Sequence, residues 1–214
     1  NPKMGWEDLA EAAYTLANPD VLWIATNTDQ TIPKERGQAP GNGTLVAAVA
    51  TASRRTPLVA GKPEAPIFHT AAKAVNSSRP VIVGDRLDTD ILGANNAKMD
   101  GALVLTGVQT YQDVIEAVPN QRPTYILRTL EDFFAPYPEI EVLYEGYEVT
   151  ATGPTWQARV RGENLSLTGP EVEDAEAFAG SESEAEAWRV ACAAWWAANP
   201  EQAARPNIQG IPGA

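Results

Sequence analysis

The stretch at residues 81–95, with the sequence VIVGDRLDTDILGAN, constrains the fold more than any other part of the chain. A short apolar run ends in Gly84-Asp85, and two further acids follow at Asp88 and Asp90. An apolar run that leads into a loop of carboxylates is typical of the carboxyl edge of a parallel sheet, where open α/β folds bind their ligands. Carboxylates gathered there suit a hard cation such as Mg²⁺, which prefers oxygen ligands. The stretch therefore predicts an α/β fold with a cation site where this strand ends.

Composition narrows the class of protein. Of the 214 residues, 44% are apolar and 21% are charged, so we expect a globular protein with a sizeable core. The formal net charge of −12 argues against a nucleic-acid partner, because binding to phosphate backbones needs clustered basic residues. We find neither an apolar run of about 18 residues, as a membrane span requires, nor a secretory signal. Cys192 is the only cysteine, which fits a reducing cytosol, and we expect a cytoplasmic protein with no membrane partner.

Short apolar runs alternate with helical segments over the first 136 residues or so. Strands are expected at 21–26, 57–60, 81–83, 102–106 and 124–127, and helices at 5–17, 44–53, 65–75, 90–98 and 111–117. The first strand reads as covered on both faces, and a polar loop follows it at 27–43. Strands that alternate with helices indicate βα units and a parallel sheet.

The pattern changes near residue 137. Segments at 139–144, 147–151 and 156–161 alternate between apolar and polar residues, which predicts an antiparallel meander. An acidic stretch at 171–186 reads as a solvated surface or connector, and a helix rich in Ala and Trp follows at 185–198. The tail from Pro206 is expected to be loosely held. These residues form a small α+β part.

Two strand-end signatures suggest chemistry. Gly61-Lys62-Pro63 follows one predicted strand and Gly84-Asp85 follows the next, so we expect both sets of side chains at the same edge of one sheet. Carboxylates there would hold Mg²⁺, and the ammonium would offset charge on a phosphoryl group. Each signature alone is weak, because Gly-Lys-Pro is a common turn and Asp88 could equally be a helix cap.

The segments VAGKPEAPIF, VIVGDRLDTDILGANNA and GALVLTGV together resemble the haloacid-dehalogenase superfamily of phosphatases. The branch with a large inserted α/β cap, which includes 4-nitrophenyl-phosphate, pyridoxal-phosphate and glycerol-phosphate phosphatases, is the most similar. The resemblance implies a partial Rossmann-like core and part of a cap. It divides the chain into a cap remainder (1–55), the second half of the core (56–136) and a C-terminal α+β extension (137–214).

The resemblance also implies roles for single residues. Lys62 matches the lysine that steadies the nucleophile and the phosphate, Asp85 the acid that binds Mg²⁺, and Asp90 the second acid of the metal site. The cap loop at 27–43 should lie over the site and select the leaving group. Its candidate substrate-binding residues are Asn27, Asp29, Lys34, Gly41 and Asn42. The Gly41-Asn42-Gly43 segment could hold a phosphate at a helix N-terminus or simply begin a helix.

The chain departs from the family pattern at the nucleophile. Family catalysis needs an aspartate in a DxD motif followed by Gly-Thr, which forms an aspartyl-phosphate, and no such motif occurs here. We expect an upstream segment to supply it.

The histidine, the cysteine and the tryptophans have plainer readings. His69 reads as an ordinary helix residue and Cys192 as a packed thiol. Trp188, Cys192, Trp195 and Trp196 form a stripe at helical spacing, which is either a core face docking the meander or an interface.

Taken with the resemblance, the sequence predicts a Mg²⁺-dependent phosphomonoester hydrolase. Its substrate would be a small phosphorylated metabolite, and glycerol 3-phosphate is chosen because bacterial members with a C-terminal extension are similar. The extension or the cap could form a homodimer. The alternative is a non-catalytic binding or scaffold protein built on a half-domain of this kind.

Overall fold

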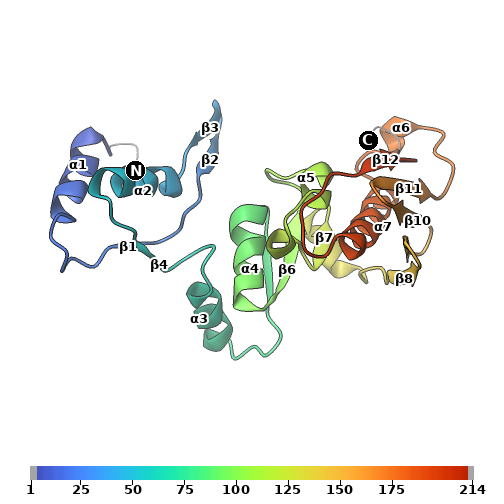
Figure 1. Ribbon diagram of the computed structural model, residues 1–214, viewed down its shortest axis with the longest axis horizontal. Helices are drawn as coiled ribbons and strands as arrows, with labels where there is room; N and C mark the ends of the chain where they lie inside the picture. The colour runs from blue at the N-terminus through green and yellow to red at the C-terminus, as the bar shows by residue number, and fades with distance from the viewer. Residues whose placement is uncertain (1–3, 212–214) are drawn as a thin grey trace. The chain divides into compact units, whose positions relative to one another are not determined.

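The structure, a computed structural model, describes residues 4–211 and divides the chain into two compact units. Unit 1 is Asn1–Pro80 with Gly93–Met99, and unit 2 is Val81–Leu92 with Asp100–Ala214. The architecture is mixed α/β with parallel strand pairs, which confirms the predicted fold class (Figure 1). The division into parts at 1–55, 56–136 and 137–214 stays a prediction. No helix of the described residues is both long and apolar enough to cross a membrane.

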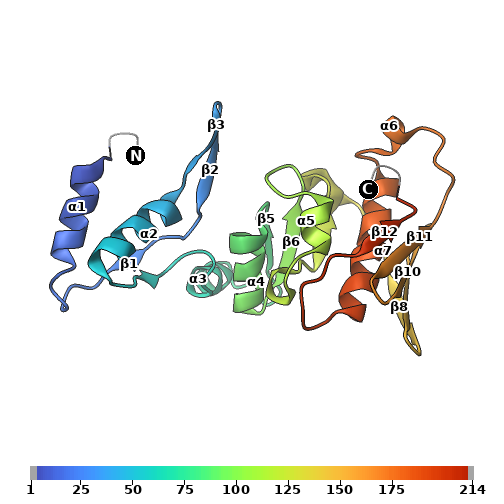
Figure 2. The ribbon, with the colours of Figure 1, turned by 45° about the horizontal axis from the view of Figure 1, so that its top comes forward.

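Unit 1 contains short strands and four helices. Its elements, in chain order, are α1 (Trp6–Thr15), β1 (Ile24–Ala25), β2 (Thr31–Lys34), β3 (Gly37–Pro40), α2 (Asn42–Ser53), β4 (Leu58–Val59), α3 (Pro66–Ala74) and most of α4 (Leu92–Ala97). Helix α1 lies against α2 (Figure 2). The Arg55 guanidinium ties the end of α1 to the following turn, because it donates hydrogen bonds to the carbonyl oxygens of Leu16, Asn18 and Val21, each at 3.1 Å.

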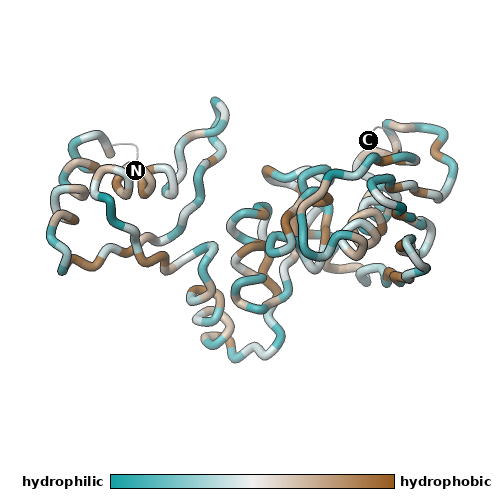
Figure 3. Tube along the Cα trace, in the orientation of Figure 1, coloured by the Kyte–Doolittle hydropathy of each residue, from teal (hydrophilic) through white to brown (hydrophobic). Residues whose placement is uncertain are grey.

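Strands β1 and β4 pair with each other in parallel, Ile24 opposite Leu58. Two expectations were wrong here. The strand predicted at 21–26 has only two residues and is not covered on both faces, since Ile24 is 51% exposed although the segment is hydrophobic (Figure 3). Moreover, the strand predicted at 57–60 is reduced to two residues, Leu58 and Val59. The shared sheet edge expected for Lys62 and Asp85 stays a prediction.

The polar segment between β1 and α2 is more ordered than the sequence predicts. The predicted loop at 27–43 contains the antiparallel hairpin β2–β3, and the hairpin register sets Thr31 opposite Pro40 and Lys34 opposite Gly37. Gly37 has a φ of 119°, which favours glycine at the hairpin turn. The hairpin therefore holds both ends of the segment close together.

Unit 2 begins with a three-stranded parallel sheet of order β5-β6-β7. The elements of this part are β5 (Val81–Gly84), a π-helical turn η1 (Leu87–Ile91), β6 (Asp100–Val104), α5 (Tyr111–Ile115), η2 (Pro119–Gln121), β7 (Tyr125–Leu127) and η3 (Leu130–Phe134). The helix predicted at 90–98 begins later, at Leu92, because the π-helical turn occupies the residues before it.

The rest of unit 2 is a five-stranded sheet and a long helix. Its elements are β8 (Glu141–Glu145), β9 (Glu148–Thr152), β10 (Gln157–Arg161), β11 (Asn164–Thr168), α6 (Ala175–Phe178), α7 (Glu182–Ala198) and β12 (Asn207–Gln209). The meander was predicted, but β11 and β12 were not. As far as Ile211 the tail is not loosely held, since β12 pairs in parallel with β11 and Ile211 is buried. Residues 212–214 lie outside the described residues. Nor is the acidic stretch only a connector, because Phe178 and Glu186 within it are buried.

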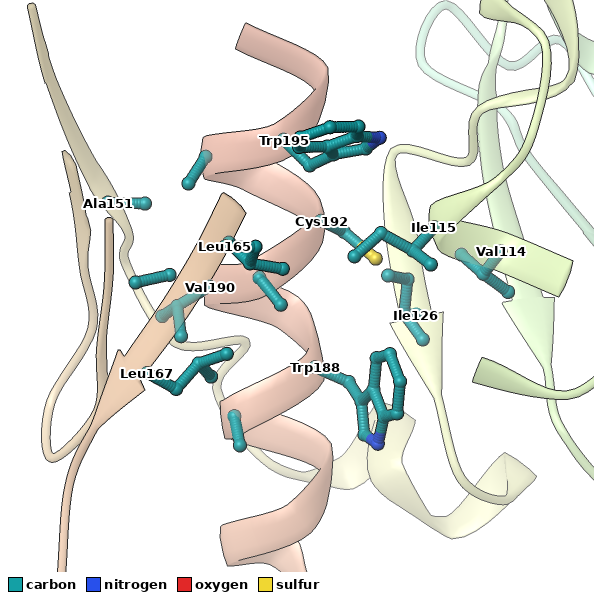
Figure 4. Close-up of a cluster of buried hydrophobic side chains, with 14 of the residues drawn as sticks. Val114, Ile115, Ile126, Ala151, Leu165, Leu167, Trp188, Val190, Cys192 and Trp195 are labelled. Atoms are coloured by element: carbon teal, nitrogen blue, oxygen red, sulfur yellow. The ribbon is translucent and has the colours of Figure 1, made fainter. Parts of the chain in front are cut away.

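Helix α7 lies between the two layers of unit 2, and its tryptophan stripe belongs to the core. Figure 4 shows Val190 on the side of the five-stranded sheet, and Trp188, Cys192 and Trp195 on the opposite side, toward Ile115. The interface reading of the stripe was therefore wrong. The stripe is a core face, but it packs on α5 and β7 instead of on the meander, because the small residues of α7 take the meander side. Burial raises the pKa of the Cys192 thiol, as a packed structural thiol requires.

Candidate active site

The carboxylates of the first candidate site follow β5 directly. Asp85 comes after Gly84 at the carboxyl end of the strand, and Asp90 lies in the π-helical turn, where it is buried. The Asp90 carboxylate accepts a hydrogen bond of 3.2 Å from the backbone N–H of Arg86. Such π-helical turns are rare and frequently mark functional sites. The fold thus fixes Asp90 through the backbone of its own loop.

Asp88, the third acid of the loop, has a different partner. Its carboxylate accepts two hydrogen bonds from the Arg86 guanidinium, at 3.0 Å from Nε and 2.7 Å from Nη2. The Asp88 side chain is more exposed than the Arg86 side chain. The helix-cap alternative for Asp88 fails, because Arg86 precedes the π-helical turn as its cap residue. Asp88 is paired within the loop, in contrast to Asp85, for which the described part of the chain shows no ion pair with a basic residue.

Two glycines leave room for the other two acids. A methyl group at position 107 would collide with the Asp85 carboxylate, and one at position 84 would collide with the Asp90 carboxylate. Gly107 follows the strand predicted at 102–106, and its place beside Asp85 was not predicted. The sequence signal was a glycine at the end of the strand next to β5. The absence of side chains at both positions lets each carboxylate lie against backbone.

The donor set fits a hard divalent cation. Asp85 and Asp90 supply carboxylate oxygens, and Mg²⁺ is commonly held by one or two carboxylates with waters completing its shell. Within residues 4–211 no cluster of three or more His, Cys, Asp or Glu side chains could hold a metal. A cation at this site would therefore depend on the two acids and on ligands of other origin.

Lys62 lies in unit 1, directly after β4. The backbone N–H of Thr28 donates to the Lys62 carbonyl oxygen at 3.1 Å, and the Lys62–Pro63 peptide bond is cis. Gly61 is required by close approach, because a Cβ there would collide with the carbonyl oxygen of Thr26. Lys62 thus belongs to unit 1 and the two acids to unit 2, and their meeting around one phosphoryl group stays a prediction.

Four of the five predicted substrate-binding residues lie in contacting segments, and one of them, Asp29, lies next to Lys62. The Asn42 amide donates to the Asn27 carbonyl oxygen at 2.8 Å, and the Asp29 carboxylate lies 4.0 Å from the Lys62 ammonium. Gly41 is the cap residue of α2, immediately before Asn42. These contacts form because parallel pairing of β1 with β4 brings the two loops that follow the strands to the same end.

Lys34 lies outside this group. It is the last residue of β2, at the turn of the hairpin, and its side chain is exposed. His69 is exposed on α3, as the sequence predicted for an ordinary helix residue.

An α/β fold with two carboxylates after a parallel strand is a frame in which many enzymes bind a ligand, and comparison with known proteins narrows the class. Residues 59–133 match the profile of the HAD-hydrolase-like family. The chain is 43% identical over 176 residues to the D-glycerol 3-phosphate phosphatase of Mycobacterium tuberculosis, covering 80% of this chain and 46% of that protein. It is 46% identical over 104 residues to the glycerol-3-phosphate phosphatase of Gallus gallus, covering 47% of this chain and 33% of that protein. Residues 59–133 are thus of the haloacid-dehalogenase-like hydrolase type, and the chain as a whole is similar to phosphatases that carry this segment.

A solved structure extends the likeness beyond the matched core. The glycerol phosphate phosphatase of Mycobacterium tuberculosis in complex with magnesium superimposes with a TM-score of 0.74 at 34% identity, covering 98% of this chain and 57% of that chain. The C-terminal part of unit 2 is therefore shared with that enzyme. The chain spans about half the length of the curated relatives it matches.

Proposed function

We propose that this chain is part of a Mg²⁺-dependent phosphomonoester hydrolase that acts on glycerol 3-phosphate. The observation that carries the proposal is the pair of carboxylates after β5, Asp85 and Asp90, each beside a glycine that leaves room for it. This pair falls within the segment that matches the hydrolase family. The similar phosphatases of Mycobacterium tuberculosis and Gallus gallus are both named for glycerol 3-phosphate, which supports the choice of substrate.

In this proposal the two acids and the lysine act on different charges. Asp85 and Asp90 hold the cation, and when bound Mg²⁺ neutralises charge on the phosphoryl oxygens. Asp90 keeps its place through the hydrogen bond from the Arg86 backbone. The Lys62 ammonium adds positive charge where negative charge develops in the transition state. The expected aspartate nucleophile of the DxD motif has no match within the 214 residues, so the proposal assigns only charge stabilisation to this chain.

The loop between β1 and α2 selects the leaving group in this proposal. Asp29 pairs with Lys62, Asn27 and Asn42 are hydrogen-bonded to each other, and Lys34 lies at the turn of the β2–β3 hairpin. Asparagine, aspartate and backbone groups suit a leaving group with hydroxyls, because they donate and accept hydrogen bonds. A cytoplasmic location and a homodimer formed through the cap or the C-terminal part belong to the same proposal.

The test is phosphate release from glycerol 3-phosphate by the complete gene product, with and without Mg²⁺. We expect Asp85→Asn to lower kcat/KM by about 100-fold or more, because the cation loses a charged ligand. Asp88→Asn is the matched control, since Asp88 lies in the same loop but pairs with Arg86, and it should retain activity within about threefold. No turnover by the wild type with glycerol 3-phosphate or other phosphate esters would favour the scaffold alternative.

A further inference from the structure

The Asp29 carboxylate is directed at Lys62 by the backbone of its own loop. One oxygen, Oδ2, lies 4.0 Å from the Lys62 ammonium, and the two side chains are 24% and 33% exposed. We propose that Asp29 is a positioning residue that orients the Lys62 ammonium toward the phosphoryl group. This proposal rests on the proposed phosphatase function and, for Asp29 alone, replaces the contact with the leaving group given above by a positioning role.

Backbone hydrogen bonds join the two segments that carry the pair. The N–H of Ala60 donates to the carbonyl oxygen of Ala25 at 2.9 Å, which extends the pairing of β1 with β4. In the loops that follow the two strands, the N–H of Thr28 donates to the Lys62 carbonyl oxygen at 3.1 Å, and the Thr28 hydroxyl donates to the same oxygen at 3.5 Å. Residue 29 is therefore held next to residue 62 through main-chain contacts that do not depend on either side chain.

The Asp29 backbone is itself fixed on both sides. Its N–H donates to the Asn27 side-chain oxygen at 3.2 Å, and its carbonyl oxygen accepts from the N–H of Gly43, in the first turn of α2, at 2.8 Å. A Cβ at Gly43 would collide with the carbonyl of Thr28, so only glycine allows this close approach. With its main chain held in this way, Asp29 has few alternative directions for its carboxylate.

The environment of the carboxylate favours a cationic partner. The second oxygen, Oδ1, is buried and accepts no hydrogen bond from the described residues. A carboxylate that is partly removed from water is costly unless a charge or a donor compensates it. The Lys62 ammonium is the compensating group for which the structure shows an ion pair with Asp29. The attraction in turn limits the positions that the flexible lysine side chain can occupy.

The proposal has a kinetic signature. A residue that orients a charge acting in the transition state affects kcat, whereas a residue that binds the substrate equally in ground and transition states affects KM. For an ion pair that is about a quarter to a third exposed, we expect Asp29→Asn to lower kcat by about threefold to fivefold and to leave KM within about twofold. Asp29→Ala, which removes the carboxylate without adding an amide, should give the same result.

The test is a double-mutant cycle on the complete gene product, with glycerol 3-phosphate as the probe. Wild type, Asp29→Asn, Lys62→Met and the double variant are compared for kcat and KM, and far-UV circular dichroism confirms that each is folded. We expect Asp29→Asn to have no further effect on kcat when Lys62 is already methionine, because the two residues act as one unit. Asp20→Asn, an exposed acid of unit 1, is the control for the loss of one negative charge.

The outcomes separate this proposal from the proposed function. If the wild type releases no phosphate from any ester, the phosphatase function fails and the positioning role falls with it. If the wild type is active but Asp29→Asn raises KM at unchanged kcat, Asp29 contacts the substrate and the positioning role is overturned alone. Independent, multiplicative effects of the two substitutions on kcat would overturn it as well.

Discussion

The two units of this protein are stabilised in different ways. Unit 2 has a continuous apolar core in which Trp195, Leu103 and Ile115 are almost fully buried. Among its described residues, unit 1 has few buried large apolar side chains, Leu16, Val49 and Phe68, and none belongs to that core; hydrogen bonds from Arg55 to backbone carbonyls tie its segments together. The difference teaches that the two acids of unit 2 are held by a packed frame, whereas Lys62 of unit 1 is held by a few polar links.

This contrast bears on the proposed chemistry. Asp90 lies in a turn whose Leu87 and Ile91 belong to the largest apolar cluster, so the backbone of this turn has little freedom. Lys62 and Asp29 follow strands of two residues each, and their geometry depends on a few hydrogen bonds. Segments with few buried apolar contacts open more easily than packed ones, which suits a region that admits and releases substrate.

Two tryptophans test the contrast most strongly. Trp195 is 1% exposed and its indole N–H donates to the Ala204 carbonyl oxygen at 2.8 Å, whereas Trp6 is 76% exposed. Trp195→Ala should lower the free energy of unfolding of unit 2 by about 3–5 kcal/mol, because it leaves a large cavity. Trp6→Ala should change stability by less than about 0.5 kcal/mol. Urea unfolding followed by far-UV circular dichroism measures both, and similar losses would refute the difference between the units.

Two carboxylates, Glu186 of unit 2 and Asp29 of unit 1, extend the comparison of the units to single hydrogen-bonded groups. The buried Glu186 carboxylate accepts hydrogen bonds from the backbone N–H groups of Thr155 and Trp156, at 2.6 and 2.9 Å, and from the Thr155 hydroxyl at 2.8 Å. The Glu186 carboxylate thus provides an acceptor for these three donors of the turn between β9 and β10. In contrast, Asp29 Oδ1 accepts no hydrogen bond from the described residues.

Glu186→Gln should consequently destabilise unit 2 by about 1–3 kcal/mol, because the amide N–H₂ faces backbone donors and one acceptor is lost. Glu176→Gln, an exposed position on α6, removes the same charge without these contacts and serves as the control. Urea unfolding at neutral pH measures the difference. Equal stability of the two variants would show that the hydrogen bonds to Glu186 contribute nothing net.

The sequence predicted the fold best where local pattern and tertiary environment agree. The strand at Val81 and the helix ending at Ala198 were found because their residues form unbroken apolar or helical patterns. The same patterns could not show that the strand at Leu58 pairs with Ile24, since pairing is a tertiary choice between short apolar runs. The strand Asn207–Gln209 was missed because a neighbouring strand, and not its own composition, makes it extended.

The candidate site shows the same limit. Lys62, Asp85 and Asp90 were picked from motifs, because residue type and spacing after a strand carry that signal. Gly107 was not recognised as a neighbour of Asp85, since the contact joins loops after two different strands. The Asp29–Lys62 pair was missed for the same reason: a separation of 33 positions in the chain becomes 4.0 Å only through the pairing of β1 with β4.

The smallest expected effect concerns an ion-pair network at the rim of the unit 2 core. Asp132 accepts hydrogen bonds from Arg128, at 2.7 Å from Nη2, and lies 3.7 Å from the buried Arg189 guanidinium, which also pairs with Glu182. Burial raises the pKa of the Asp132 carboxyl, but the hydrogen bonds and charge of Arg128 outweigh burial and hold the pKa below its ordinary value of 3.8.

The sign of the pH dependence follows from this lowered pKa. A carboxyl whose folded-state pKa lies below its unfolded value contributes stability above the unfolded pKa and loses it as the pH falls through the folded pKa. The stability advantage of the wild type over Asp132→Asn should therefore be constant near neutral pH, on the order of 1 kcal/mol, and should shrink below pH 3.8. Urea unfolding of both proteins across this range measures it, with Asp20→Asn as an exposed control. An advantage that persists unchanged to the acid limit would mean that packing around residue 132, and not its charge, links η3 to α7.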